Sequence, residues 1–156
     1  MDFERFLDLL KALKREGVDY VLVGGVAVNL HGIVRATEDV DLFIRPSEDN
    51  VERLKRALRS LWDDPEIAQI SARDFAGEFP TIRYGPPDDP MVIDLISALG
   101  SAFTFDDLDA QTVMVEGVPV RLATPATLYR MKKDTVRPID RADAVALREK
   151  FRLGDT

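Results

Sequence analysis

Apolar residues recur along the chain with two different spacings. In some stretches they return every three or four residues, as on one face of an α-helix, and in others they alternate with polar residues, as in a half-buried β-strand. The helical spacing, with its capping and stop signals, predicts helices over residues 3–15, 27–30, 46–61 and 138–151 and a further helix beginning at 124–125. The β-rich runs predict strands over residues 20–23, 39–44, 81–84, 91–96, 112–115 and 118–122. Residues 62–78 show neither pattern.

Helices and strands alternate throughout a chain of 156 residues, a length typical of one domain. We find no internal repeat, no low-complexity tract and no linker. The sequence therefore predicts a single α+β domain over residues 1–156.

Composition excludes several classes of chemistry. Cysteine is absent, which excludes disulfides, thiolate metal sites and cysteine nucleophiles. The only histidine is His31, so a two-histidine zinc motif is impossible. No apolar run approaches the ~18 residues that span a bilayer. The first five residues lack the pattern of a signal peptide, so we expect a cytoplasmic protein with no membrane partner.

Charge is distributed unevenly. The chain has a net charge of −7, but residues 121–156 hold 9 Lys and Arg against 5 Asp and Glu. This basic end is either a solvated helical surface or one wall of a cleft that binds a polyanion. The overall acidity argues against broad binding of duplex DNA, which depends on neutralising phosphates.

Two acids share one face of a predicted strand. In residues 39–44 the alternation places Asp39 and Asp41 on one face and apolar side chains on the other. Asp94 interrupts the apolar strand 91–96, where an unpaired buried carboxylate would cost several kcal/mol. If the two strands are neighbours, the three carboxylates form one cluster, and oxygen ligands of this kind favour Mg²⁺ or Mn²⁺.

Other interpretations of these acids stay open. An Asp-x-Asp pair at a strand end is often only solvated, and Asp94 could pair with Arg83 across a hairpin. Asp88 and Asp89 are rivals for the third acid, although their proline-rich turn favours solvation.

A glycine pair, Gly24-Gly25, stands where a strand gives way to a helix. Glycine allows the backbone to approach a phosphate closely, and a helix start offers free N–H donors. The spacing matches neither a Walker loop nor a dinucleotide fingerprint.

Residues 23–42 read VGGVAVNLHGIVRATEDVDL, and the later segments 128–132 and 137–143 read LYRMK and RPIDRAD. Together they resemble the motifs of minimal nucleotidyltransferases of the polymerase-beta-like superfamily, in particular the AbiEii-type (MenT-like) toxin group. The resemblance implies an α+β fold with a mixed β-sheet flanked by helices. It also implies Mg²⁺-dependent transfer of a nucleoside monophosphate (NMP) from a nucleoside triphosphate (NTP) to a hydroxyl, with release of pyrophosphate.

Carried onto this sequence, the resemblance implies roles for three groups of residues. The metal ligands would be Asp39, Asp41 and Asp94, with Asp94 also helping to deprotonate the attacking hydroxyl. The glycines would hold the triphosphate. The further nucleotide-binding candidates are Arg35, Thr37, Lys132, Arg137 and Asp140.

Plainer roles compete with some of these. Asp140 and Asp143 have the spacing of helix-capping residues, and His31 suits a cap or a supporting position. Arg35 reaches either phosphate or solvent, and Thr37 either lines the site or bonds to backbone. Only one of Lys132 and Lys133 can face the cleft, and the motif favours Lys132.

The resemblance leaves the acceptor open. An RNA or tRNA end would fit a toxin–antitoxin or phage-defence context, with a cognate antitoxin protein as an expected partner. The alternatives are transfer to a small hydroxylated molecule of the aminoglycoside kind, and a non-catalytic protein that binds nucleotide or a partner.

Overall fold

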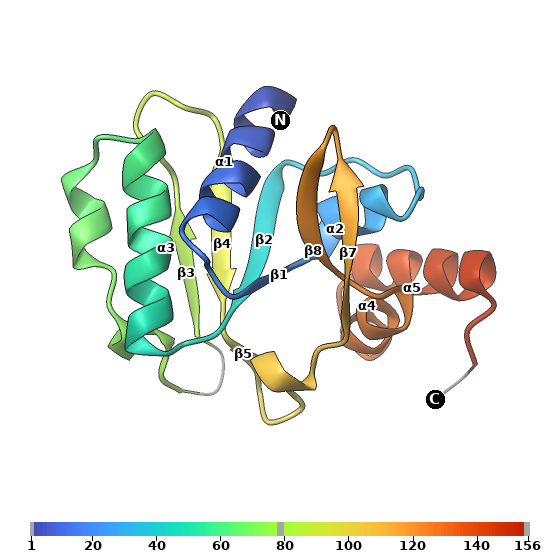
Figure 1. Cartoon of the computed structure of the whole chain (residues 1–156). Coiled ribbons are helices and arrows are strands. Elements are labelled where there is room, and N and C mark those ends of the chain that lie inside the picture. The colour runs from blue at the N-terminus through green and yellow to red at the C-terminus, as the bar shows by residue number, and fades with distance from the viewer. Residues whose placement is uncertain (1, 78–79, 155–156) are drawn as a thin grey trace.

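A computed structural model describes residues 2–77 and 80–154 of the chain (Figure 1). The α-helices of this part are α1 (Phe3–Arg15), α2 (Gly24–Leu30), α3 (Glu48–Leu61), α4 (Pro125–Lys132) and α5 (Pro138–Phe151). The strands are β1 (Tyr20–Val23), β2 (Asp39–Ile44), β3 (Thr81–Tyr84), β4 (Val92–Ile96), β5 (Ala98–Leu99), β6 (Phe103–Thr104), β7 (Ala110–Val115) and β8 (Val118–Ala123). The short 3₁₀ helices are η1 (Pro65–Gln69), η2 (Ala72–Phe75) and η3 (Phe105–Asp107).

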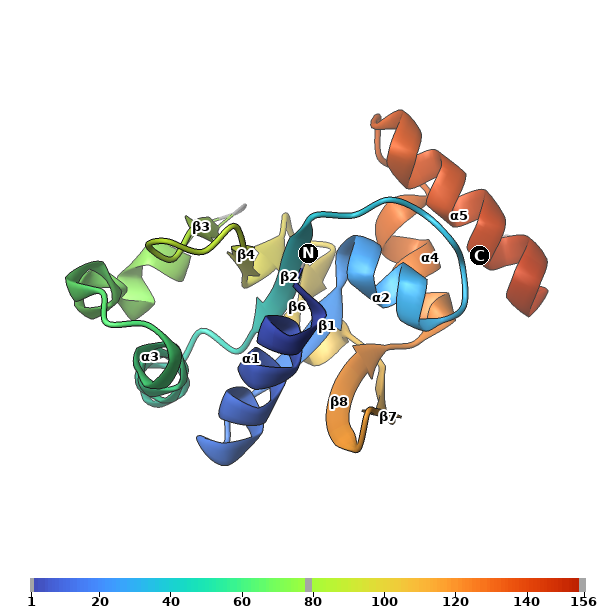
Figure 2. The same cartoon turned by 90° about the horizontal axis from the view of Figure 1, so that it is seen from above.

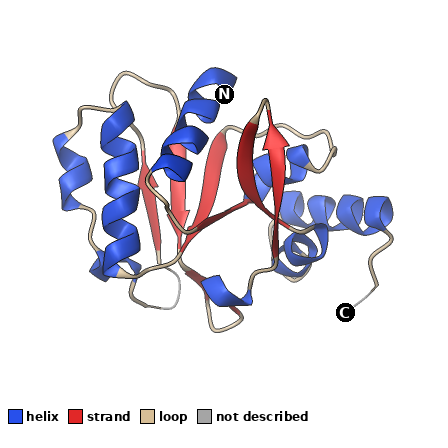
Figure 3. Cartoon of the chain, viewed as in Figure 1, coloured by secondary structure: helices blue, strands red, loops and turns tan. Residues whose placement is uncertain are grey.

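The main sheet is mixed and runs in the order β3-β4-β2-β1-β8-β7. β2 pairs parallel with β4 and antiparallel with β1, while β1 pairs parallel with β8. β3 and β7 are the edge strands. Helices lie on both sides of the sheet (Figure 3). The predicted α+β fold with a mixed sheet is therefore confirmed.

The two faces of the sheet carry different helices. α1 and α3 lie side by side on one face, whereas α2, α4 and α5 gather on the other (Figure 2). The buried face of α1 presents Phe6, Leu9, Leu10 and Leu13 to the core, where Leu42 of β2 is also fully buried. Burial of this apolar surface is the main stabilising contribution to the fold. This packing also orients β2 so that Asp39 and Asp41 point toward the helices on the other face of the sheet.

Local capping signals begin or end several helices close to the predicted residues, with α3 beginning at Glu48 rather than at residue 46. Ser47 caps α3 by accepting a hydrogen bond from the Asn50 backbone N–H, and Thr124 caps α4 in the same way with Thr127. Gly32 follows the C-cap of α2 with a φ of +88°, a conformation that suits glycine.

Some boundaries differ from the prediction. α2 begins at Gly24 rather than residue 27, because the glycine pair itself forms the first turn. β7 begins at residue 110 rather than 112, and Phe3 is 48% exposed although it shares the helical spacing of α1. Residues 65–69 and 72–75 form 3₁₀ turns capped by Asp64 and Ser71. Such short turns carry no periodicity that a sequence could reveal. Residue 78, the last residue of the stretch 62–78 for which the sequence predicts no element, lies outside the described residues.

Candidate active site

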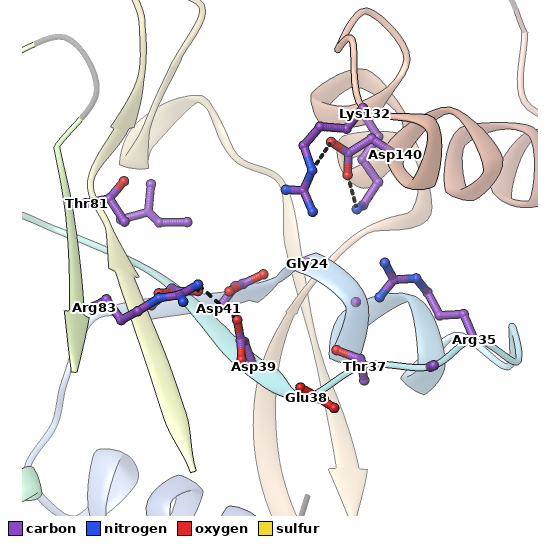
Figure 4. Close-up of a pocket in the computed structure, with 15 residues that line it drawn as sticks. Gly24, Arg35, Thr37, Glu38, Asp39, Asp41, Thr81, Arg83, Lys132 and Asp140 are labelled. Atoms are coloured by element: carbon purple, nitrogen blue, oxygen red, sulfur yellow. Dashed lines mark hydrogen bonds and ion pairs between the residues drawn. The ribbon is translucent and has the colours of Figure 1, made fainter. Parts of the chain in front are cut away.

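A cavity of about 680 Å³ opens between the sheet and the helices α4 and α5 (Figure 4). Its walls are formed by residues of β2, β3 and β4, the start of α2, the loop before β2, and the α4–α5 region. All ten residues singled out from the sequence line it: Gly24, Gly25, Arg35, Thr37, Asp39, Asp41, Asp94, Lys132, Arg137 and Asp140. The structure thus brings together residues that are up to 116 positions apart in the chain.

The three acids lie on neighbouring strands. Asp41 of β2 stands directly opposite Asp94 of β4 in the parallel register, and Asp39 is two residues before Asp41 on the same face. Burial, together with the nearby carboxylates of Asp94 and Asp39, raises the pKa of Asp41 from 3.8 to about 7. Close carboxylates that oppose one another's ionisation are stabilised by any cation placed among them.

An arginine supplies that cation here. Arg83 of β3 stands opposite Asp94 in the antiparallel register, and its Nε lies 3.0 Å from Asp94 Oδ1. Its Nη2 lies 3.1 Å from Asp39 Oδ2. The two alternatives for Asp94, a carboxylate cluster and an ion pair with Arg83, are therefore both present. Sequence reasoning named Arg83 only as a competitor, although its place on a strand paired with β4 is the signal that puts it in the site.

The donor chemistry of these acids fits a hard divalent cation, because carboxylate oxygens are the ligands that Mg²⁺ and Mn²⁺ prefer. Within residues 2–77 and 80–154, however, no three His, Asp or Glu side chains are spaced as ligands of a single metal ion. Arg83 contacts Asp39 and Asp94 directly.

The glycine pair allows close packing at the floor of the cavity. Gly24 has a φ of +73°, and a Cβ there would overlap the Asp41 carboxylate. A Cβ on Gly25 would overlap the guanidinium of Arg35 and crowd the hydroxyl of Thr37. Gly24 is therefore required by its backbone conformation and by the close approach of Asp41, whereas Gly25 lets Arg35 and Thr37 lie against the backbone. Contact of the pair with a triphosphate stays a prediction.

The opposite wall is a network of buried charges. Lys132 Nζ lies 3.2 Å from Asp140 Oδ1 and 2.9 Å from Asp143 Oδ2, and all three side chains are largely buried. Arg35 Nε lies 2.9 Å from Asp143 Oδ1. The two groups form an ion pair, but their geometry is not that of a hydrogen bond. Arg137 completes the wall, with its Nε 3.8 Å from Asp140 Oδ2 and its side chain 72% exposed.

This network decides three alternatives that the sequence left open. Asp140 and Asp143 do not cap α5, whose N-cap residue Arg137 makes no side-chain cap, because both carboxylates are held by Lys132. Lys132 rather than Lys133 faces the cavity, and Lys133 lies over the ring of Tyr129. Arg35 is not directed to solvent, since its side chain is only 15% exposed.

The remaining candidates lie elsewhere. His31 is the C-cap residue of α2, and its Nε2 is 2.7 Å from the Ala123 carbonyl oxygen, so it supports the fold. Asp89 is bound by Arg5 and Trp62, away from the cavity, and Asp88 is exposed in the turn. Neither competes with Asp94 as the third acid.

The arrangement joins an acidic wall to a wall that carries Lys132 and Arg137. Such a cavity suits a polyanionic ligand that brings its own divalent cation, because each wall then meets the opposite charge. Within the described residues, no helix is both long and apolar enough to cross a bilayer.

Three solved structures have a similar architecture, and two of them are described as a nucleotidyltransferase or as nucleotidyltransferase-like. A protein of Thermotoga maritima assigned as a nucleotidyltransferase superposes with a TM-score of 0.60 at 13% identity, over 97% of this chain and 92% of that chain. ANT(2″)-Ia, solved in complex with adenylyl-2″-tobramycin, gives a TM-score of 0.55 at 14% identity over 92% and 86% of the two chains. An antigenic nucleotidyltransferase-like protein of Paracoccidioides brasiliensis gives 0.52 at 19% identity over 91% and 72%. The fold is that of a nucleotidyltransferase.

The family follows from the sequence itself. Residues 8–144 match the family described as "Nucleotidyl transferase AbiEii toxin, Type IV TA system". This chain therefore belongs to the AbiEii nucleotidyltransferase toxin family of type IV toxin–antitoxin systems. No curated protein matches it in sequence.

Proposed function

We propose that this protein transfers an NMP group from an NTP to a hydroxyl acceptor, with Mg²⁺ or Mn²⁺ and with release of pyrophosphate. One observation carries the proposal: Asp39, Asp41 and Asp94 converge from two paired strands on a cavity whose opposite wall holds Lys132 and Arg137. Clustered like charges lower the stability of the folded protein, so a protein with a purely structural role would gain nothing from them.

The acidic wall would bind the cation that accompanies the nucleotide. Asp39, Asp41 and Asp94 would be its ligands, and the bound ion would supply charge stabilisation at the reacting phosphate. The attacking hydroxyl oxygen forms a bond to the α-phosphorus while the bond to the pyrophosphate oxygen breaks. Asp94 would take the proton of that hydroxyl.

The basic wall would bind the triphosphate. Arg137 is exposed and free to move toward a ligand, whereas Lys132 is fixed by Asp140 and Asp143 and offers a preorganised charge. Preorganised charges stabilise the departing pyrophosphate without reorganisation during the reaction. Arg35, Thr37 and the glycine pair would complete the nucleotide side of the cavity.

For the acceptor we favour an RNA or tRNA end, in keeping with the toxin family and with the basic character of residues 121–156. A cognate antitoxin protein is then the expected partner. The second candidate is a small hydroxylated molecule, because a structure of this fold was solved with an adenylylated aminoglycoside.

The test is release of pyrophosphate from each of the four NTPs with Mg²⁺ or Mn²⁺, with total RNA, with small alcohols or aminoglycosides, and without acceptor. Asp39→Asn/Asp41→Asn is the inactive variant, and Asp63→Asn changes an exposed aspartate outside the cavity as the matched control.

Release that needs RNA and is lost only in the double variant supports transfer to RNA. Release that needs a small alcohol supports the second candidate. Bound NTP without release under every condition would refute the enzymatic proposal and favour a protein that binds nucleotide without turnover.

A further inference from the structure

The cation nearest the three acids is part of the protein. Arg83 bridges Asp39 and Asp94: its Nη2 lies 3.1 Å from Asp39 Oδ2, and it donates to both oxygens of Asp94, at 3.0 Å and 3.4 Å. These are the two carboxylates that flank Asp41 in the site. A guanidinium in this position satisfies oxygen atoms that a bridging divalent cation would need.

The surroundings of Arg83 allow it to leave. It lies on β3, an edge strand that pairs with β4 only, and its side chain is 67% exposed. Lys132, by contrast, is buried between two carboxylates of α5, and moving it away would break both of these ion pairs. Of these two cations beside the cavity, Arg83 is therefore the mobile one.

We propose that Arg83 is a positioning residue that acts as an internal counter-ion, holding Asp39 and Asp94 in the metal-free protein and giving way when a divalent cation binds. The inference rests on the proposed function, since it concerns the same acids. Arg83 then competes with the metal and sets the concentration of Mg²⁺ or Mn²⁺ at which the site fills.

The direction in which the affinity for the metal ion changes when Arg83 is replaced distinguishes a competing charge from a supporting one. Loss of an arginine that merely supports the shape of the site would weaken metal binding. Loss of a competing positive charge would strengthen it, because a like charge beside a cation opposes binding. The two roles are therefore distinguished by the direction of the change.

The experiment measures binding of Mn²⁺ by electron paramagnetic resonance of the full chain, without nucleotide. Arg83→Gln removes the charge, Arg83→Lys keeps it, and Arg59→Gln removes the charge of an exposed arginine outside the cavity. We expect Arg83→Gln to lower the Kd for Mn²⁺ about tenfold. Arg83→Lys and Arg59→Gln should stay near the wild-type value.

Thermal unfolding gives a second readout. Without metal, Arg83→Gln should melt below the wild type, because Asp39 and Asp94 lose their counter-ion. Saturating Mn²⁺ should then raise the Tm of Arg83→Gln by more than it raises that of the wild type. This pairing of a less stable metal-free form with tighter metal binding is not expected from a damaged site.

Two results would overturn the proposal, and only one of them would also contradict the proposed function. If the wild type binds Mn²⁺ and Arg83→Gln binds it equally or more weakly, Arg83 is no competitor, but the proposed function stands. If the wild type binds no more Mn²⁺ than Asp39→Asn/Asp41→Asn does, the metal site of the proposed function fails together with this inference.

Discussion

Replacing Asp41 with asparagine should stabilise the metal-free protein at neutral and alkaline pH. Burial, with the nearby carboxylates of Asp94 and Asp39, raises the pKa of Asp41 from 3.8 to about 7. Between these values the unfolded chain releases the Asp41 proton while the folded protein keeps it. The wild type therefore loses stability as the pH rises through this window. The amide of Asp41→Asn does not ionise, so the variant avoids this loss.

The size of the effect follows from the difference between the two pKa values. A difference of about 3, at about 1.4 kcal/mol for each pH unit, sets an upper limit of about 4 kcal/mol. Asp41 keeps some contact with solvent, which lowers the expected gain to about 1–3 kcal/mol. For a chain of this length, that gain corresponds to an increase in Tm of about 3–10 °C.

The assay is urea unfolding in EDTA at several pH values from 4.5 to 8.5. The difference in free energy of unfolding between Asp41→Asn and the wild type should grow with pH and level off above about 7. Asp63→Asn, at an exposed position outside the cavity, is the control and should show no such trend. A variant that is less stable than the wild type at pH 8, or a gap that does not change with pH, would refute the reasoning.

Two further substitutions test the floor and the opposite wall of the cavity. Gly24→Ala should destabilise the protein by at least about 2 kcal/mol, because alanine would have to adopt a left-handed backbone conformation and its Cβ would overlap Asp41. A calorimetric Tm equal to that of the wild type would contradict this. Lys132→Met should cost about 3 kcal/mol in urea unfolding, since it removes a buried cation 2.9 Å from the Asp143 carboxylate. The matched variant Lys133→Met should cost far less, and equal losses in the two variants would show that burial of the charge is not the cause.

Much of the local structure is readable from the sequence. The alternation in residues 39–44 places Asp39 and Asp41 on one face of β2, and the proline at position 138 marks the start of α5. These features depend on neighbours within a few residues, through side-chain alternation, capping and the fixed φ of proline. The same reasoning fails for residues 65–75, whose 3₁₀ turns are too short to impose a period.

The motifs also reveal which kinds of residue form the site, but they do not reveal all of the contacts between these residues. The spacing of Asp140 and Asp143 equally suits a helix cap, and only the packing of α4 against α5 brings Lys132 between them. Arg35 and Asp143 are 108 residues apart, so no local rule predicts their ion pair.

The sequence by itself determines the elements, the face on which the acids lie and the class of ligand that they suit. Tertiary structure alone decides that β4 lies beside β2 in the register that sets Asp94 opposite Asp41, and that β3 carries Arg83 into the same site. The physical reason is that strand order and register are selected by burial of the whole apolar face of the sheet. That burial sums over residues far apart in the chain, whereas helix caps and side-chain alternation depend only on near neighbours.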